Sequence, residues 1–128
     1  MAEGDGATIL LIEDDEVIRE LYRKIFEFRG FRVIEAVDGN DGIEKFVEHR
    51  NEISLLVADV MMPNKNGRET YEAITAIKND VKVIFTSGFN SELTKQLRKE
   101  GFHYLQKPFS PEDLLQRIVE VMGDDRNR

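Results

Sequence analysis

Short apolar runs alternate along the chain with segments in which apolar residues recur every three or four positions. The runs occupy residues 8–12, 31–35, 54–60, 82–86 and 102–105. Several of them are apolar on both faces, which is typical of strands buried in a parallel sheet. Five strands that alternate with five helices favour a single parallel sheet with right-handed crossovers. The pattern therefore predicts an α/β fold.

The helices are predicted from the spacing of their apolar residues. We expect one face of the first helix to pack on the sheet through Val17, Ile18, Leu21, Tyr22, Ile25 and Phe28, with Gly30 ending the helix. The apolar positions of the later helices are Ile43, Phe46 and Val47; Tyr71, Ile74 and Ile77; Leu93 and Leu97; and Leu114, Leu115, Ile118, Val119 and Met122. Ser110 followed by Pro111 is a typical start for the last helix.

Polar side chains follow the predicted strands at the points where ligands bind in parallel sheets. Asp14 and Asp15 follow the first strand, Asp59 ends the third, Thr86 ends the fourth and Lys107 follows the fifth. Two like charges ~4 Å apart cost about 4 kcal/mol at an effective dielectric constant of about 20, so a cation between the carboxylates is favoured. Oxygen ligands without His or Cys are typical of a hard cation such as Mg²⁺. The alternative for Asp14 and Asp15 is that they cap the first helix.

Four short segments resemble one known family. They are Asp14-Asp15, the stretch DVMMPNKNG over 59–67, Thr86-Ser87-Gly88 and Lys107-Pro108-Phe109. In this order and at strand ends, they make the chain similar to a response-regulator receiver domain of two-component signalling, from about residue 7 to 122. The resemblance implies a doubly wound, flavodoxin-like (βα)5 fold whose five-stranded parallel sheet has the strand order 2-1-3-4-5.

The resemblance also implies the chemistry of the site. Asp59 would accept a phosphoryl group from the phosphohistidine of a histidine kinase. The Mg²⁺ cofactor would be held by Asp59, by Asp15 directly, by Asp14 through water and by the main-chain carbonyl of Met61. A carboxylate is a competent nucleophile for this step when positive charge offsets its repulsion from the phosphoryl group.

Further residues are implied to support or to report the transfer. Lys107 would bring a second positive charge to the phosphoryl oxygens, and the Thr86 hydroxyl would donate a hydrogen bond to another. Tyr104 would switch between exposed and buried positions and change the surface of the fourth helix, fifth strand and fifth helix; the alternative is an ordinary half-buried strand tyrosine. The Lys107–Pro108 peptide resembles the cis peptide of the family.

Composition limits the partners and the compartment. The 18 Lys and Arg residues against 25 Asp and Glu residues give a net charge of −7, which argues against direct nucleic-acid binding by this domain. There are no cysteines, and no apolar run approaches ~18 residues, so we expect a cytoplasmic protein with no membrane partner. We expect residues 1–128 to form one receiver domain with an ordered core over about 7–122 and no output domain. A stand-alone regulator and a receiver segment of a hybrid sensor kinase both remain open.

Two other functions would require residues that the receiver motif does not share. A Mg²⁺-dependent phosphohydrolase would need an acid two residues after its nucleophile, and that position is Met61. A flavodoxin-like nucleotide binder would need a phosphate loop rich in Gly, Ser or Thr after the first strand, where this chain has Glu-Asp-Asp-Glu. We therefore expect a phosphoacceptor domain that is not itself an enzyme, although it assists its own phosphorylation and slow dephosphorylation.

Overall fold

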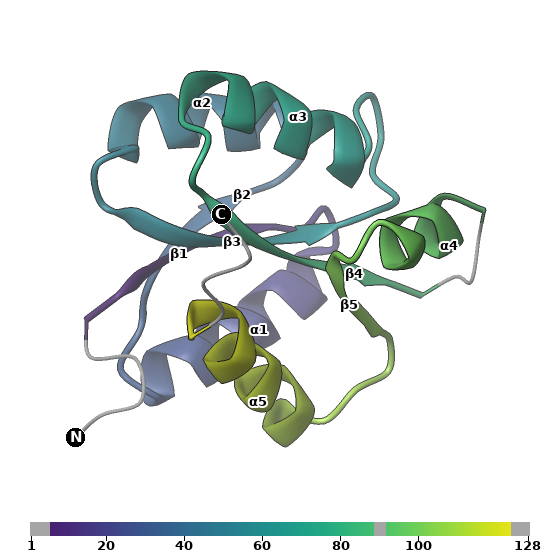
Figure 1. The fold of residues 1–128 in the computed structure, drawn as a ribbon. Helices are drawn as coiled ribbons and strands as arrows, with labels where there is room; N and C mark the ends of the chain where they lie inside the picture. Colours follow the sequence, from purple (N-terminus) through teal and green to yellow (C-terminus); the bar gives the residue numbers. More distant parts are fainter. Residues whose placement is uncertain (1–5, 89–91, 124–128) are drawn as a thin grey trace.

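The computed structural model describes residues 6–88 and 92–123, and within them five strands alternate with five helices (Figure 1). The strands are β1 (Thr8–Ile12), β2 (Arg32–Ala36), β3 (Ile53–Asp59), β4 (Lys82–Ser87) and β5 (His103–Gln106). The helices are α1 (Glu16–Phe28), α2 (Gly39–His49), α3 (Gly67–Ile77), α4 (Glu92–Lys99) and α5 (Pro111–Met122). Each predicted strand is present, and its ends differ from the prediction by no more than one residue.

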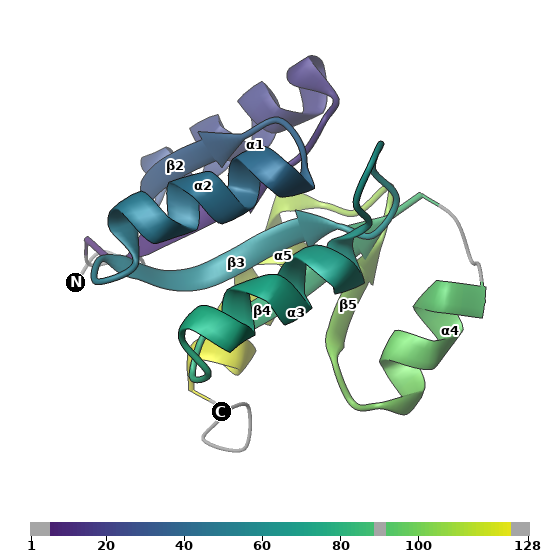
Figure 2. The ribbon, with the colours of Figure 1, turned by 90° about the horizontal axis from the view of Figure 1, so that it is seen from above.

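The strands form one parallel sheet in the order β2-β1-β3-β4-β5, which confirms the predicted fold class and strand order. Helices α1 and α5 cover one face of the sheet, while α2, α3 and α4 lie on the other (Figures 1 and 2). The connection after β1 leads to β2 on one side, whereas β3 lies on the other side of β1. The strand order therefore reverses between β1 and β3, and a crevice for ligands is expected beyond their carboxyl ends.

Two apolar cores hold these layers together, one on each face of the sheet. Alternate residues of β1 point to opposite cores, with Ile9 and Leu11 facing α1 and α5, and Leu10 and Ile12 facing α2 and α3. All four side chains are at most 1% exposed. A strand buried on both faces cannot alternate polar with apolar residues, which explains the continuous apolar run at this point in the sequence.

The predicted core face of α1 was wrong for three residues, because Val17, Leu21 and Phe28 are 76%, 54% and 86% exposed. At 100° per residue these three lie about 100° to 140° around the helix from Tyr22, which is buried. The apolar arc of α1 is therefore wider than the sheet can cover. Phe26, which lies about 40° from Tyr22 on its other side, is fully buried in their place.

Local signals set the ends of the first and last helices as predicted. Gly30 has a φ of 90°, a left-handed conformation that L-residues with a side chain rarely adopt, and it follows the end of α1. Ser110 caps α5 by accepting a hydrogen bond from the Asp113 amide, the Asp113 side chain accepts one in return from the Ser110 amide, and Pro111 begins the helix. The β5–α5 connection that carries Lys107 therefore leads into a well-defined helix start.

Candidate functional site

The carboxyl ends of β1 and β3 place two acidic side chains next to each other. Ile12 pairs with Ala58 in the parallel register, so the residues that follow them, Glu13 and Asp59, meet at the edge of the sheet. Both are buried, at 1% and 7% exposure. One carboxylate oxygen each of Glu13, Asp14 and Asp59 lie within 4.8 Å of one another. We call these three residues the acidic pocket.

Lys107 closes the acidic pocket from the end of β5. Its Nζ donates to Glu13 Oε1 at 2.7 Å and to Asp59 Oδ2 at 3.1 Å. The side chains of Lys107, Glu13 and Asp59 are only 16%, 2% and 10% exposed. The peptide bond from Lys107 to Pro108 is cis, as the family resemblance implied.

Burial changes the titration of two groups in the pocket. It raises the pKa of Glu13, an effect to which the negative charge of Asp59 adds and which the hydrogen bond from Lys107 only partly offsets. Burial by itself would lower the pKa of Lys107, but the hydrogen bond to Glu13 and the charge of Asp59 outweigh it and raise that pKa. Lys107 is therefore an ammonium at neutral pH, and the pocket holds one fixed positive charge.

The loop after β3 brings main-chain groups close to Asp59. The Met61 amide donates to Asp59 Oδ1 at 3.0 Å, and the Gly67 amide donates to the Val60 carbonyl at 2.9 Å. A Cβ atom at Gly67 would lie 2.5 Å from the Asp59 carbonyl oxygen, so only glycine allows this approach. Gly67 thus lets α3 begin directly against the main chain of Asp59 and Val60.

Of the predicted metal ligands, Asp14 and Asp59 lie in the acidic pocket, while Asp15 has another contact. The Asp15 side chain accepts a hydrogen bond from the Ile18 amide at 3.1 Å and caps α1. This is the alternative that the sequence left open, and it holds for Asp15 but not for Asp14. Glu13, which sequence reasoning missed, takes the third position. The sequence carries no local signal for this position, because it follows from the strand register, in which the residue after Ile12 lies beside the residue after Ala58.

The two predicted switch residues, Thr86 and Tyr104, lie on the neighbouring strands β4 and β5. Thr86 pairs with Asp59 in the β3–β4 register and is 1% exposed. Tyr104 is 6% exposed, so its side chain is in the buried position. The Arg98 guanidinium lies 4.7 Å from the centre of the Tyr104 ring.

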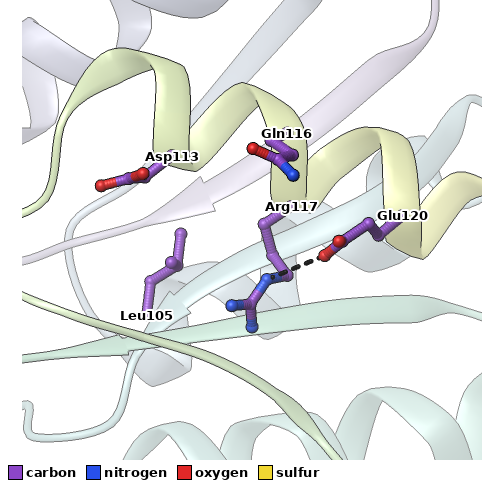
Figure 3. Close-up of a pocket in the computed structure, with 5 residues that line it drawn as sticks. All are labelled: Leu105, Asp113, Gln116, Arg117 and Glu120. Carbon is purple, nitrogen blue, oxygen red and sulfur yellow. Dashed lines mark ion pairs between the residues drawn. The ribbon is translucent and has the colours of Figure 1, made fainter.

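A separate hollow of about 340 Å³ lies between β5 and α5 (Figure 3). It is lined by Leu105, Asp113, Gln116, Arg117 and Glu120. Arg117 donates to the Tyr104 carbonyl at 2.9 Å and pairs with Glu120 at 3.2 Å. The backbone of the predicted switch residue is therefore tied to α5, on a surface that shares no residue with the acidic pocket.

The donor set of the acidic pocket fits a hard divalent cation. Three carboxylates approach one another and Lys107 contributes one positive charge, so a divalent cation would bring the four groups to neutrality when all are ionised. Carboxylate oxygens without His or Cys suit Mg²⁺, Ca²⁺ or Mn²⁺.

Comparison with known proteins agrees with the fold and the site. Residues 9–119 match the model of the response regulator receiver domain, and the chain belongs to this family. The transcriptional regulatory protein CpxR of Escherichia coli (strain K12) is 36% identical over 116 residues, which are 89% of this chain and 48% of CpxR. The sensor kinase CckA of Brucella abortus (strain 2308) is 31% identical over 119 residues, which are 91% of this chain and 13% of the kinase.

Solved structures show the same architecture. A chain of the CheX–CheY–BeF3–Mg²⁺ complex from Borrelia burgdorferi superposes on this one with a TM-score of 0.83 at 26% identity. The match covers 92% of this chain and 90% of that chain. The chain is thus a receiver domain of two-component signalling. It spans about half the length of the curated regulators that it matches first.

The comparisons and the described helices also bear on the phosphohydrolase alternative, on membrane spans and on nucleic-acid binding. The phosphohydrolase alternative receives no support from these comparisons, and Met61 is a half-exposed methionine where that reading needs an acid. No described helix is long and apolar enough to cross a bilayer. The expected absence of direct nucleic-acid binding concerns this domain alone, since its relatives include longer proteins named as transcriptional regulators.

Proposed function

We propose that this receiver domain accepts a phosphoryl group on the Asp59 carboxylate from the phosphohistidine of a histidine kinase. The observation that carries the proposal is the position of Asp59, which ends β3 beside the carboxylates of Glu13 and Asp14 and accepts a hydrogen bond from the ammonium of Lys107. Membership of the family supports the same role. The finer assignment of each residue follows from its contacts.

In the transfer, an oxygen of Asp59 attacks phosphorus and forms an O–P bond while the P–N bond to the histidine breaks. The imidazole nitrogen keeps the electron pair of that bond and takes up a proton. The Met61 amide and Lys107 hold the two oxygens of Asp59 at 3.0 and 3.1 Å, so the nucleophile is oriented before the donor arrives. Phosphoryl transfer depends mainly on such positioning and on charge neutralisation.

Glu13, Asp14 and Asp59 would hold a Mg²⁺ ion, and the main-chain carbonyl of Met61 remains a predicted further ligand. When bound, the ion supplies positive charge that offsets the phosphoryl oxygens. The relative in the CheX complex was solved with BeF3 and Mg²⁺, which supports a metal at the corresponding place. Asp15 serves this site indirectly, because it caps the helix that follows the ligands.

The response to phosphorylation would run from Thr86 to Tyr104. A phosphoryl group adds roughly two negative charges and three acceptor oxygens, which give the Thr86 hydroxyl a new partner. A shift of Thr86 would alter the environment of Tyr104 on the next strand, and with it the contacts of Arg98 and Arg117 in α4 and α5. The surface of α4, β5 and α5 is therefore the proposed signalling surface.

The test is incubation with acetyl phosphate and Mg²⁺ followed by mass spectrometry of the intact protein. We expect one acid-stable, alkali-labile phosphoryl group in the wild type and in Asp41→Asn, which changes a carboxylate at the start of α2. We expect none in Asp59→Asn. A label that Asp59→Asn retains, or that maps to a serine, would contradict the assignment. Thr86→Ala should still acquire the label, since Thr86 is proposed to respond to phosphorylation.

A further inference from the structure

We propose that Arg19 of α1 is a positioning residue for the acidic pocket. Its guanidinium holds the main-chain carbonyl of Glu13 and so orients the carboxylates of Glu13 and Asp14 toward the metal. The inference rests on the proposed function, because it assumes that these carboxylates bind the ion. Arg19 itself touches neither the ion nor the phosphoryl group in this proposal.

Arg19 lies between the loop after β1 and the neighbouring strand β2. Its side chain is 14% exposed, Nη1 donates to the Glu13 carbonyl at 2.9 Å, and Nε pairs with Glu35 Oε1 at 3.3 Å. Glu35 therefore anchors the planar guanidinium from one side while the carbonyl accepts from the other. A planar group with fixed donors is well suited to hold two partners in one geometry.

The Glu13 carbonyl is the group through which the direction of the ligand loop can be set. The Glu13 amide already donates to Ala36 O at 3.1 Å, and its carboxylate accepts from the Asp15 amide at 3.1 Å and from Lys107 at 2.7 Å. The carbonyl lies in the same rigid peptide plane as the Asp14 amide. When Arg19 fixes that plane, it restricts the directions in which Asp14, an exposed residue, can point its side chain.

The positive charge of Arg19 should weaken cation binding, whereas its proposed positioning role should strengthen it. The direction in which the metal affinity changes in a variant therefore tests the proposal. Removal of a positive charge near three carboxylates would by itself strengthen the binding of a cation. Loss of orientation would weaken that binding. A weaker metal affinity after Arg19 is neutralised therefore reports positioning and not charge.

Arg23 provides a matched control one turn further along α1. Its Nε pairs with the other oxygen of Glu35, Oε2, at 3.3 Å, and its Nη1 pairs with Glu27 at 2.9 Å. No hydrogen bond links Arg23 to Glu13 among the described contacts of these residues. Arg23→Met thus removes the same charge and the same kind of pair without touching the ligand loop.

The experiment is a Mg²⁺ titration of the metal-free, ¹⁵N-labelled protein, read from the amide shifts of Glu13, Asp14 and Asp59. We expect Arg19→Met to raise the Kd for Mg²⁺ about tenfold, as replacement of groups that orient metal ligands does. Arg23→Met should change the Kd by no more than about twofold, the size expected for an exposed ion pair. Arg19→Lys, which keeps the charge but has a single donor nitrogen, should fall between wild type and Arg19→Met.

A second readout needs no metal. Amide hydrogen exchange of Asp14 and Asp15 in the metal-free protein should be faster in Arg19→Met than in Arg23→Met. If Arg19→Met does not fold, Arg19→Lys decides instead, because it keeps the charge but loses the planar guanidinium, so a rise in the Kd by a smaller factor still reports positioning.

Three results would overturn the proposal: an unchanged or lower Kd in Arg19→Met, an equal rise in Arg23→Met, or, where Arg19→Lys has to decide, an unchanged Kd in that variant. A wild type whose Glu13, Asp14 and Asp59 amides do not respond to Mg²⁺ would instead show that the proposed metal site is wrong, and the role of Arg19 would fall with it.

Discussion

Two clusters in this domain have the same make-up, one cation between two carboxylates, and differ in burial. In the pocket, Lys107 lies between Glu13 and Asp59, and the three side chains are 16%, 2% and 10% exposed. The Glu13 pKa is raised there, because burial penalises its charge more than Lys107 favours it. The buried cluster is therefore held together at a cost in desolvation.

The second cluster joins α3 to the end of α4 at the surface. Arg68 pairs with Glu100 at 2.7 Å and with Glu72 at 3.1 Å, and its guanidinium lies 5.3 Å from the centre of the Phe102 ring. The Glu100 pKa is lowered, with the hydrogen bond from Arg68 as the largest cause. Here the ionised carboxylate is favoured, because burial opposes its charge less than the hydrogen bonds from Arg68 and Gln96 stabilise it.

Two glutamates, each hydrogen-bonded to a cation, thus shift their pKa in opposite directions. The difference is burial, which leaves Glu13 with an unfavourable charge that further positive charge can relieve. In the surface cluster the negative charge of Glu100 is already favourable, and the cluster serves as a contact between α3 and the end of α4. We infer that the buried cluster is the one able to respond to a metal ion.

The largest effect is expected from Lys107→Met. It removes the cation from two buried carboxylates, so we expect the free energy of unfolding without metal to fall by about 3 kcal/mol. Urea denaturation measures this loss. The control is Lys45→Met, which removes a surface pair with Asp41 and should cost no more than about 0.5 kcal/mol. Equal losses in the two variants would show that burial does not separate the clusters.

The next effect is the response of the pocket to Mg²⁺. At a concentration ten times the Kd, a bound ligand stabilises the folded state by about 1.4 kcal/mol, which thermal melts detect as a higher Tm. Asp14→Asn should lose this gain. Asp15→Ala should keep it, although loss of the α1 cap should lower the stability by about 1 kcal/mol with or without metal. The reverse pattern would make Asp15 the ligand.

A smaller effect is expected at the surface cluster. Arg68→Met removes two ion pairs and a cation–π contact, so we expect a loss of about 1 kcal/mol, measured by urea denaturation. Glu72→Gln, which removes only the more exposed pair, should lose less. The Mg²⁺-induced rise in Tm should remain in both variants. Its disappearance in Arg68→Met would mean that the two clusters are coupled.

The smallest effect concerns pH. Because the folded-state pKa of Glu100 lies below the ordinary value of 4.5, its contribution to stability is present above pH 4.5 and is lost as the pH falls through the folded-state pKa. The stability difference between wild type and Arg68→Met should therefore shrink on acidification below pH 4.5. Carboxyl NMR titration should also show the Glu100 pKa returning toward its ordinary value in the variant.

The sequence alone determined the fold class, the order of elements and the placement of four candidate residues at one edge of the sheet. Asp14, Asp59, Thr86 and Lys107 were predicted because each lies at or just after the end of an apolar strand, and parallel strands bring their carboxyl ends together. Local periodicity in the sequence is enough to locate the strands and helices, and therefore to locate the residues at their ends.

The tertiary structure decided what periodicity leaves open. It placed Glu13 in the pocket and made Asp15 a helix cap, because the pairing of Ile12 with Ala58 sets which carboxylate lies beside Asp59. It also left Val17 exposed, because the sheet covers only part of the apolar arc of α1. Register and coverage arise between elements distant in sequence, so the residues of one segment cannot specify them.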